Sequence, residues 1–542
     1  MTEKKRKTTY SIGIVLLGML LGLLVGVMFG ERLNRVKSPQ VSATNTSSLI
    51  SQVLALVDRA YVDKVDYDSV SGVMINAMLS SLDPHSGYMS AKETKSNGEM
   101  MEGHFEGIGI LLHQHGDTVF ASSITPHSPA FRAGVLPGDR ILKVDTTWVS
   151  GRGFCKDMSN VVNLIRGPRY STVTLGIQRG NTKKIQYIKL QRDVIPQKSV
   201  SVATMLDKTT GYIYIAHFSG TTATEFHSAL LQLNKEGMKH LVLDLRGNPG
   251  GSLETAIRVA DEMLPKGDLI VYTEGQHYQR ERVKATSGGL FEEGQLTVLM
   301  NAFSASGSEV VAGALQDNDR ATIVGHRSFG KGLVQRQFDM SDGSSLRLTV
   351  ARYYSPSGRC IQRPYDKGSD EYYMDFLNSV TQDYELADSV MKAVYDTTQL
   401  FYTKKGRKVY GGGGIQPDVV LPYMKDSNLV YYNSLINKQI FDALVMDELS
   451  AHYADMIKRY PTAEVFLKEY KVDDATLQRI IARGEKAGIK RNDACLKRYG
   501  QEILSRYKAS LAMSLYDDDV YYSIMLPYDW ELQKALKTNY KL

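Results

Sequence analysis

Ser306 and Lys331 are the two residues of this 542-residue chain whose types and settings best suit a nucleophile and its base. Ser306 stands among small residues, directly before a helical-looking stretch from Glu309 to Leu315. Backbone N–H groups at the start of a helix can hold the negative charge that develops when a carbonyl group is attacked. The pattern therefore favours acyl transfer with Ser306 as the nucleophile.

Lys331 can take the proton of a serine only as a neutral amine, and burial is what keeps a lysine neutral. It follows a strand-like apolar run from Ala321 to Val324, and Gly330 and Gly332 on either side allow the backbone to pack tightly around it. In an extended segment Gln335 shares a face with Lys331, so its amide oxygen could orient the amine. An isolated serine and lysine usually lie on a solvated surface. The surrounding motifs decide whether Ser306 and Lys331 form a catalytic pair or are two surface residues.

Those motifs resemble the carboxy-terminal-processing peptidases, also called tail-specific proteases. In the family's order, over about residues 45 to 425, they are Leu82-Asp-Pro-His-Ser86, Phe105-Glu-Gly-Ile-Gly109, Asp244-Leu-Arg-Gly-Asn-Pro-Gly-Gly251, Ser304-Ala-Ser306, Phe329-Gly-Lys-Gly332 with Gln335, Tyr354-Ser-Pro-Ser-Gly358 and Gly414-Ile-Gln-Pro-Asp418. The resemblance implies an α/β serine-peptidase core of the crotonase-like or ClpP-like kind. It implies Ser306 as nucleophile, Lys331 as base and Gln335 as the lysine's partner.

The resemblance also implies an oxyanion hole made of backbone N–H groups. Gly307 would supply one of them, and Gly250 or Gly251 the other. Gly307 is a departure, because relatives often carry alanine there; its N–H is unchanged, and the local backbone is looser. We expect Asp244 and Arg246, in the strand before the glycine turn, to pair as structural charges rather than to act in catalysis.

Residues 105 to 191 alternate short strand-like runs with one helix near Met158 to Ile165, and they resemble a PDZ domain. The loop Gly107-Ile108-Gly109-Ile110 matches the one whose N–H groups bind the terminal carboxylate of a peptide, beside a strand edge that can accept an added strand. Arg166 either caps the end of the helix or senses a bound carboxylate, and the cap is the simpler interpretation.

A phosphate-binding loop is a competing interpretation of Gly325 to Lys331, which has the spacing G-x-x-x-x-G-K. Gly332, however, stands where Ser or Thr should hold magnesium. The following segment, Leu333 to Met340, has strand character, whereas a phosphate loop must open a helix. We therefore exclude the nucleotide interpretation.

Histidines offer two further alternatives. A Ser-His-Asp triad remains open, because sequence positions do not say which histidine lies near Ser306 in space. The four candidates are His217, His227, His240 and His326. His113 and His115 alternate on one strand face, but two ligands without a third are weak support for a metal. We expect no metal and no cofactor.

Ile12 to Phe29 is an uninterrupted apolar run of 18 residues, about 27 Å long as a helix and close to the hydrocarbon thickness of a bilayer. The small-x-small pattern at Val41-Ser-Ala43 lies too far downstream for signal cleavage, so we expect an uncleaved anchor. The basic residues 4–7 predict a cytoplasmic N-terminus and a chain that is extracytoplasmic from residue 31 onward. Glycines at every fourth position either pack two anchors together or are merely common in such segments; they are Gly18, Gly22, Gly26 and Gly30.

The predicted organisation is multidomain α/β. Its parts are a cytoplasmic basic segment (1–10), a transmembrane anchor (11–30), a linker (31–48), an N-terminal helical region (49–102), a PDZ domain (103–192), a peptidase core (193–425) with an inserted lid-like element (363–411), and a C-terminal helical domain (426–542). The formal charge of +6 includes +3 from the N-terminal segment, which leaves no basic excess for nucleic acid. The three widely spaced cysteines, Cys155, Cys360 and Cys495, imply no disulfide framework.

These features predict a single-pass inner-membrane serine endopeptidase whose catalytic part is periplasmic. Its partners would be proteins or peptides with exposed C-termini. Two alternatives stay open: a non-catalytic PDZ scaffold, and a peptidase that is inactive until a partner binds. A homo-oligomer or a regulatory partner is a further possibility. Retention of Ser306, Lys331 and Gln335 together favours the enzyme, because a pure scaffold has no reason to keep all three.

Overall fold

The computed structural model describes residues 45–151, 157–180, 182–385 and 399–537. Its two compact units are Met1–Met74 and Ile75–Leu542. The predicted anchor at 11–30, the basic segment before it, most of the linker and Cys155 lie outside the described residues. Within the described ranges, no helix is long and apolar enough to cross a membrane.

The helices predicted at the start of the folded chain are present. They are α2 (Asn45–Ala60) and α3 (Tyr67–Ser80), at the start of the N-terminal helical region that we expected over 49–102. In the first unit, the Tyr67 hydroxyl donates to Asp58 at 3.0 Å.

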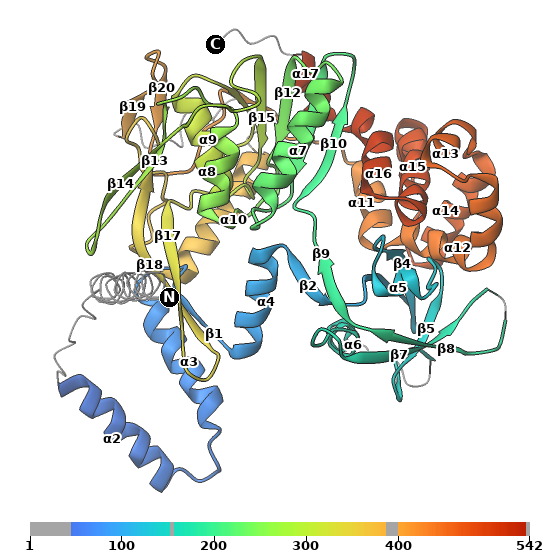
Figure 1. The fold of residues 1–542 in the computed structure, drawn as a ribbon, viewed down its shortest axis with the longest axis horizontal. Coiled ribbons are helices and arrows are strands. Elements are labelled where there is room, and N and C mark those ends of the chain that lie inside the picture. The colour runs from blue at the N-terminus through green and yellow to red at the C-terminus, as the bar shows by residue number, and fades with distance from the viewer. Residues whose placement is uncertain (1–44, 152–156, 181, 386–398, 538–542) are drawn as a thin grey trace, which may run out of the picture. The chain divides into compact units, whose positions relative to one another are not determined.

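The predicted α/β core is built on a six-stranded sheet, in which only the first pair of strands is antiparallel (Figure 1). In spatial order the strands are β10 (Val200–Met205), β11 (Thr210–Ile215), β12 (His240–Asp244), β15 (Gln295–Met300), β16 (Thr322–Gly325) and β21 (Val419–Val420). The expected α/β class is confirmed. Parallel strands of this kind are near-continuous apolar runs because both faces are buried.

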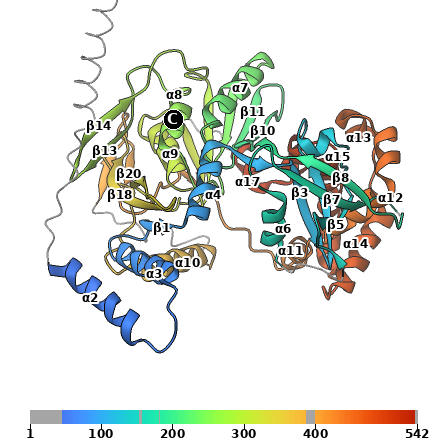
Figure 2. The ribbon, with the colours of Figure 1, turned by 60° about the horizontal axis from the view of Figure 1, so that its bottom comes forward.

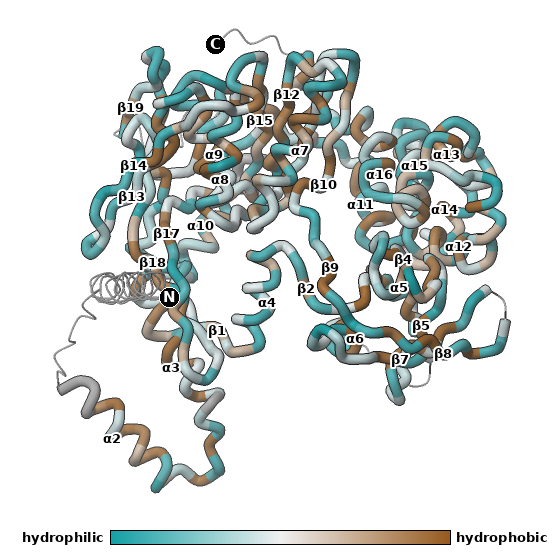
Figure 3. The backbone as a smooth tube through the Cα atoms, viewed as in Figure 1, coloured by the Kyte–Doolittle hydropathy of each residue, from teal (hydrophilic) through white to brown (hydrophobic). Residues whose placement is uncertain are grey.

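Both faces of this sheet are covered. Leu241 and Leu243 of β12 point into a core with α7 (Thr222–Lys235), α8 (Leu253–Asp261) and α9 (Gly307–Asp317). Val242, between them, points to the other face, where Leu526 and Leu532 of the C-terminal segment pack. Figure 3 shows the hydrophobic residues concentrated on β12 and β15. The last helices therefore complete the peptidase-like core, a role that the sequence did not reveal.

A second, antiparallel sheet lies beside the first and carries Gln335. Its strand order is β1 (Gly87–Met89), β18 (Ser345–Tyr354), β13 (Leu269–Gly275) and β14 (Tyr278–Lys284), with β17 (Leu333–Asp339) also paired to β18. Arg347 of β18 stands opposite Gly87 on one side and Gln337 on the other. The helix α4 (Ala91–Glu102) follows β1 and begins with a capping box between Ser90 and Glu93.

The region that resembles a PDZ domain forms its own sheet around an apolar core. It consists of β3 (Ile110–His115), β4 (Thr118–Ile124), α5 (Pro129–Arg132), β5 (Arg140–Val144), β6 (Thr147–Trp148), α6 (Met158–Ile165), β7 (Thr172–Gln178) and β8 (Gln186–Gln191), and the strands β2 (His104–Gly107) and β9 (Asp193–Pro196) pair antiparallel at its entrance and exit. The helix α6 lies where the sequence placed it, whereas the short helix α5 was not predicted.

The segment 363–411 is only partly helical. Among its described residues it holds α10 (Ser369–Glu385) and a hairpin of β19 (Leu400–Tyr402) and β20 (Lys408–Tyr410). From Leu429 to Lys537 the chain is mostly helical, as Figure 2 shows in red and orange. These helices are α11 (Leu429–Asn437), α12 (Ile440–Arg459), α13 (Ala463–Glu469), α14 (Asp474–Lys486), α15 (Asp493–Leu515), α16 (Asp518–Met525), the 3-10 turn η2 (Leu526–Tyr528) and α17 (Trp530–Lys537).

Candidate active site

Ser306 occupies the turn between β15 and α9, in a backbone conformation that serine rarely adopts. Its φ is +54° and its ψ is −113°. Such strain persists only where surrounding contacts enforce it. Here Ser304 enforces it, because its hydroxyl donates to the Leu245 carbonyl at 2.8 Å and its carbonyl accepts from Phe329 N–H at 2.9 Å. The loop thus holds the candidate nucleophile at the start of a helix, as predicted.

The glycine turn after β12 lies directly against Ser306. A Cβ on Gly250 would come 2.7 Å from the Ser306 Cβ and 2.8 Å from the Gly307 nitrogen, so no larger residue fits there. Both Gly250 and Gly251 have positive φ, +96° and +141°. The N–H of Gly250 donates to Asn248 Oδ1 at 2.8 Å. In the described part of the chain, the N–H groups of Gly251 and Gly307 make no hydrogen bond, which leaves them available to an oxyanion.

Lys331 lies in the loop between β16 and β17 and is partly buried. Its amine donates to Gln335 Oε1 at 3.0 Å, the pairing that the spacing predicted. Burial, helped by the nearby positive charge of Arg347, lowers the pKa of the Lys331 amine to about 8. A substantial fraction of this lysine is therefore neutral near physiological pH, which a general base requires.

Gln335 is held in turn by the Leu82-to-Ser86 loop. Its Nε2 donates to the carbonyl of His85 at 2.6 Å. Tyr373 of α10 donates to the Pro84 carbonyl at 3.0 Å, and Tyr372 lies 3.2 Å from His85 Nε2. The inserted helix thus supports the loop that orients the lysine's partner.

Glu309 is a residue of the site that our sequence reasoning missed. This 1%-exposed carboxylate accepts from the N–H groups of Ser306 (2.8 Å) and Lys331 (2.9 Å) through Oε2. Through Oε1 it accepts from the Ser328 hydroxyl (2.5 Å) and the Gly330 N–H (2.7 Å). It therefore ties the nucleophile loop to the lysine loop. Burial raises the pKa of Glu309 to about 7, although all four donors act to lower it. The Ser-x-x-Glu spacing is the sequence signal that could have revealed it.

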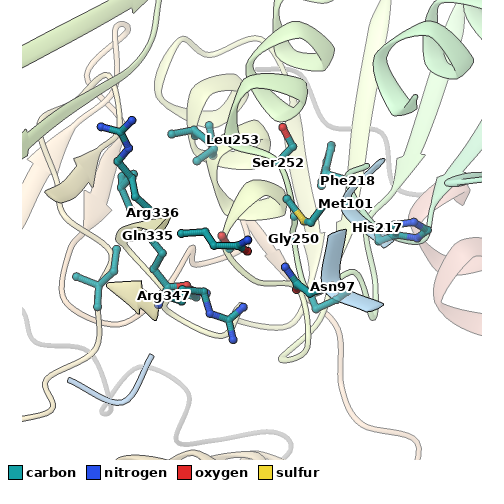
Figure 4. A pocket seen from close by; sticks show the side chains of 18 of the residues that line it. Asn97, Met101, His217, Phe218, Gly250, Ser252, Leu253, Gln335, Arg336 and Arg347 are labelled. Carbon is teal, nitrogen blue, oxygen red and sulfur yellow. The ribbon is translucent and has the colours of Figure 1, made fainter. Parts of the chain in front are cut away.

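One cavity of about 580 Å³ brings the predicted catalytic residues together. It is lined by Ser306, Lys331, Gln335, Gly250 and Gly251, which come from four separate loops and strands. Figure 4 shows Gln335, Arg336 and Arg347 on one side and Asn97, Met101 and His217 on the other, with Gly250 between them. Among the described residues, no hydrogen bond joins the Lys331 amine to the Ser306 hydroxyl.

The four histidines of the triad alternative are separated by the fold. His227 pairs with Glu262 (2.6 Å), His240 with Thr297 (2.9 Å) and His326 with Glu531 (3.0 Å). His217 alone of the four lines the cavity; its Nε2 is buried without a partner, and burial lowers the pKa of its ring. No carboxylate of the described chain is hydrogen-bonded to His217, so it lacks the third member that a triad needs.

Asp244 and Arg246 pair as expected, with Arg246 Nη2 2.5 Å from Asp244 Oδ2. The guanidinium also pairs with Asp529 (2.5 Å) and Glu531 (2.7 Å) near the C-terminus. The cluster is structural: it fastens the last helix to the strand that leads into the glycine turn.

The residues predicted to bind a peptide tail also lie together. A second cavity, of about 770 Å³, is lined by Gly107, Ile108, Gly109, Ile110 and Arg166, along with apolar side chains of α6. The N–H of Arg166 closes α6 by donating to Val162, as a cap would. Its guanidinium instead lies 4.3 Å from the Phe105 ring and pairs with Glu99 of α4 at 3.4 Å.

Comparison with known proteins agrees with this geometry. Residues 209–367 match the model of peptidase family S41, and residues 120–179 match a PDZ domain. A carboxy-terminal-processing protease of Bartonella bacilliformis is 39% identical over 306 residues, which are 56% of this chain and 69% of that protein. This chain belongs to the carboxy-terminal-processing protease family.

Another relative of this chain is a probable CtpA-like serine protease of Staphylococcus epidermidis. It is 32% identical over 65% of this chain and 70% of that protein. A solved photosystem II D1 C-terminal processing protease is 26% identical; the match covers 71% of this chain and 96% of that one, with a TM-score of 0.35. Residues 431–517 match a family of unknown function (DUF8443). The protein is a serine-type peptidase with a PDZ domain.

Proposed function

We propose that this protease is a membrane-anchored endopeptidase that captures protein tails through its PDZ domain and cleaves peptide bonds with a Ser306–Lys331 dyad. The observation that carries the proposal is the partly buried Lys331 amine, with a pKa of about 8, in the same cavity as the strained Ser306. A lysine in a surface salt bridge would have the opposite shift.

The chemistry follows from the groups that line the cavity. The neutral Lys331 amine takes the hydroxyl proton of Ser306 as its oxygen attacks the scissile carbonyl carbon. The N–H groups of Gly307 and Gly251 stabilise the resulting oxyanion, and that of Gly250 would join them if it left Asn248. The lysine then gives the proton to the leaving amine, which yields an acyl-enzyme. Water, deprotonated by the same amine, hydrolyses the ester and frees Ser306.

The test uses the purified full-length chain, an unstructured protein substrate and mass spectrometry of the products. Fragments should appear with the wild type and be missing with Ser306→Ala. Equal fragments from both would show that a contaminant or another nucleophile is responsible, and the scaffold alternative would then stand.

Tail capture rests on the cavity that Ile108, Gly109 and Arg166 line. An amidated C-terminus removes the anion that the loop would bind, so binding or cleavage should weaken by about one to two powers of ten, the range for charge-assisted hydrogen bonds. Isothermal titration of matched acid and amide peptides measures this. Equal affinities would contradict tail sensing.

A partner-gated peptidase is the second candidate. Two features of the site favour it. The Lys331 amine donates its hydrogen bond to Gln335 and not to Ser306, and the Gly250 N–H donates to Asn248. A resting site of this kind would need substrate or a partner to align it. Activity that rises on adding a cell envelope extract, and not on adding more substrate, would distinguish gating from constitutive activity.

The membrane location is proposed from the apolar run Ile12–Phe29 and the basic residues before it. Protease added to intact spheroplasts should digest the chain beyond residue 30 and spare the extreme N-terminus. Protection of the large domain would overturn the assignment of the catalytic part to the periplasmic side of the inner membrane.

A further inference from the structure

The catalytic cavity is lined by cations and by no carboxylate. Of the described residues that line it, three are basic, namely Lys331, Arg336 and Arg347, and none is Asp or Glu. With a pKa of about 8, the Lys331 amine is mostly protonated at pH 7, so it adds to the positive charge of the two arginines there. A peptide segment that enters this cavity meets a positive field with no acidic group to balance it.

Arg347 is the arginine whose charge has no partner. It lies in the middle of its sheet, between β1 and β17, and its Nε is buried without a hydrogen-bond partner. No ion pair or hydrogen bond joins its guanidinium to any other described residue. The side chain as a whole is only partly buried, but a buried donor without a hydrogen-bond partner is costly, so such donors are normally paired.

Asp83 and Glu309, the two carboxylates whose charges act on Lys331, already accept hydrogen bonds. Asp83 accepts from the Ser86 hydroxyl at 2.6 Å and from the N–H groups of His85 and Ser86 at 2.8 Å. Glu309 accepts four hydrogen bonds from the nucleophile and lysine loops. The described chain therefore provides Arg347 with no ion-pair partner, and a carboxylate that entered the cavity would supply one.

We propose that Arg347 binds the side-chain carboxylate of an Asp or Glu in the substrate, close to the scissile bond, and so gives the protease a preference for acidic residues there. A guanidinium suits this role because its planar fork can bind a carboxylate through two hydrogen bonds. The inference rests on the proposed function, in which the substrate lies across this cavity. The terminal carboxylate of a peptide is the other source of the same chemistry, and the PDZ loop is its proposed binding site.

Arg336 provides a matched control. It lines the same cavity from β17, but it is exposed, its Nη1 donates to the Tyr278 hydroxyl at 3.3 Å, and its guanidinium lies 5.8 Å from the Tyr278 ring. Removing it lowers the positive charge of the cavity by the same amount as removing Arg347. A general electrostatic effect would respond equally to both changes, whereas a specific carboxylate site responds only to Arg347.

The experiment uses the full-length enzyme and internally quenched peptides in which one Glu is moved through the three positions on each side of the scissile bond. Each peptide has a Gln counterpart, and each is made with a free and an amidated C-terminus. Assays at pH 9 keep Lys331 mostly neutral, so that a bound carboxylate does not change the rate through the base. Ser306→Ala supplies the background.

At one position or more, kcat/KM of the wild type should be about tenfold to hundredfold higher for Glu than for Gln, with free and amidated peptides alike. Arg347→Met should bring that ratio close to one, while Arg336→Met keeps it. Arg347→Glu should reverse the preference, so that a Lys peptide is cleaved faster than the Gln peptide. Circular dichroism and tail binding report whether each variant folds.

Equal rates for Glu and Gln at every position in the wild type would overturn the inference, whatever the variants do. So would a preference that survives Arg347→Met, or one that depends on Arg347 only with free C-termini, which would assign the site to the terminal carboxylate. These outcomes are separate from a failure of the proposed function, in which no peptide, Gln series included, is cleaved in a Ser306-dependent way.

Discussion

Two regions position their residues by different means: the cavity that contains Ser306 and Lys331, and the proposed tail-binding groove, which is lined by Gly107 to Ile110 and Arg166. In the cavity the reacting groups are fixed by hydrogen bonds, four of them to Glu309 alone and two through Gln335. The groove is built from a loop, a strand edge and the apolar face of α6. The ion pair between Arg166, which lines the groove, and Glu99 is partly exposed. Bond making needs fixed positions, whereas tail capture needs shape and free backbone groups.

The strongest way to break this comparison is Lys331→Arg. Guanidinium keeps the charge but cannot lose a proton, so kcat/KM should fall on the order of 10⁴-fold while tail binding in the groove is unchanged. Peptide cleavage and isothermal titration measure the two properties separately. The exposed Lys266→Arg is the matched control. Substantial hydrolysis by Lys331→Arg would rule out the dyad and return attention to His217.

Glu309→Gln tests whether hydrogen bonds fix the cavity. An amide offers one acceptor oxygen where the carboxylate has two, so two of the four donors lose their acceptor. We expect stability to fall by about 1 to 3 kcal/mol and kcat by roughly 100-fold, with KM changed far less. Denaturant unfolding and steady-state kinetics measure these effects. Glu254→Gln, exposed in the first turn of α8, controls for the loss of charge, and an equal effect there would contradict the assigned role.

The pH dependence of the rate sharpens the comparison. The folded-state pKa of Lys331 is lowered to about 8 from the ordinary value of 10.5, so its active, neutral form is lost as pH falls through 8. Between pH 6 and 7 kcat/KM should rise about tenfold and then level off above pH 8, whereas tail binding should not follow this curve. Arg347→Met removes a neighbouring positive charge, so the pKa of Lys331 should rise and the increase in kcat/KM should move to higher pH. A flat profile from pH 6 to 9 would contradict a lysine base.

The smallest effect belongs to the groove. Glu99→Gln removes the ion pair with Arg166, whose side chain is 40% exposed and whose Nη1 lies 3.4 Å from Glu99 Oε2. Such exposed pairs contribute about 0 to 1 kcal/mol. We expect the Kd for a tail peptide to change less than about fivefold and kcat to stay the same. A loss of turnover as large as that of Glu309→Gln would show that the groove and the cavity are coupled through α4.

Residue types and spacing were enough to predict the site's main members. Lys331 and Gln335 are four residues apart, and residues at this spacing share a face in an extended segment. The sequence therefore predicted their pairing, and the structure has Lys331 Nζ 3.0 Å from Gln335 Oε1. The helix Met158–Ile165 and the strand–turn–helix around Gly250 followed from apolar periodicity and glycine for the same reason: their determinants lie within a few residues.

What the tertiary structure alone decided depends on residues far apart in the chain. The contact of Gln335 with the carbonyl of His85 spans 250 positions, and that of Arg246 with Glu531 spans 285. No local pattern encodes such pairs, since they are set by how sheets and helices pack. The sequence by itself determined which residues are the candidates for the chemistry. Packing decided that Lys331 is shielded enough to lose its proton, that Arg347 has no ion-pair partner among the described residues, and that the C-terminal helices cover the second face of the central sheet.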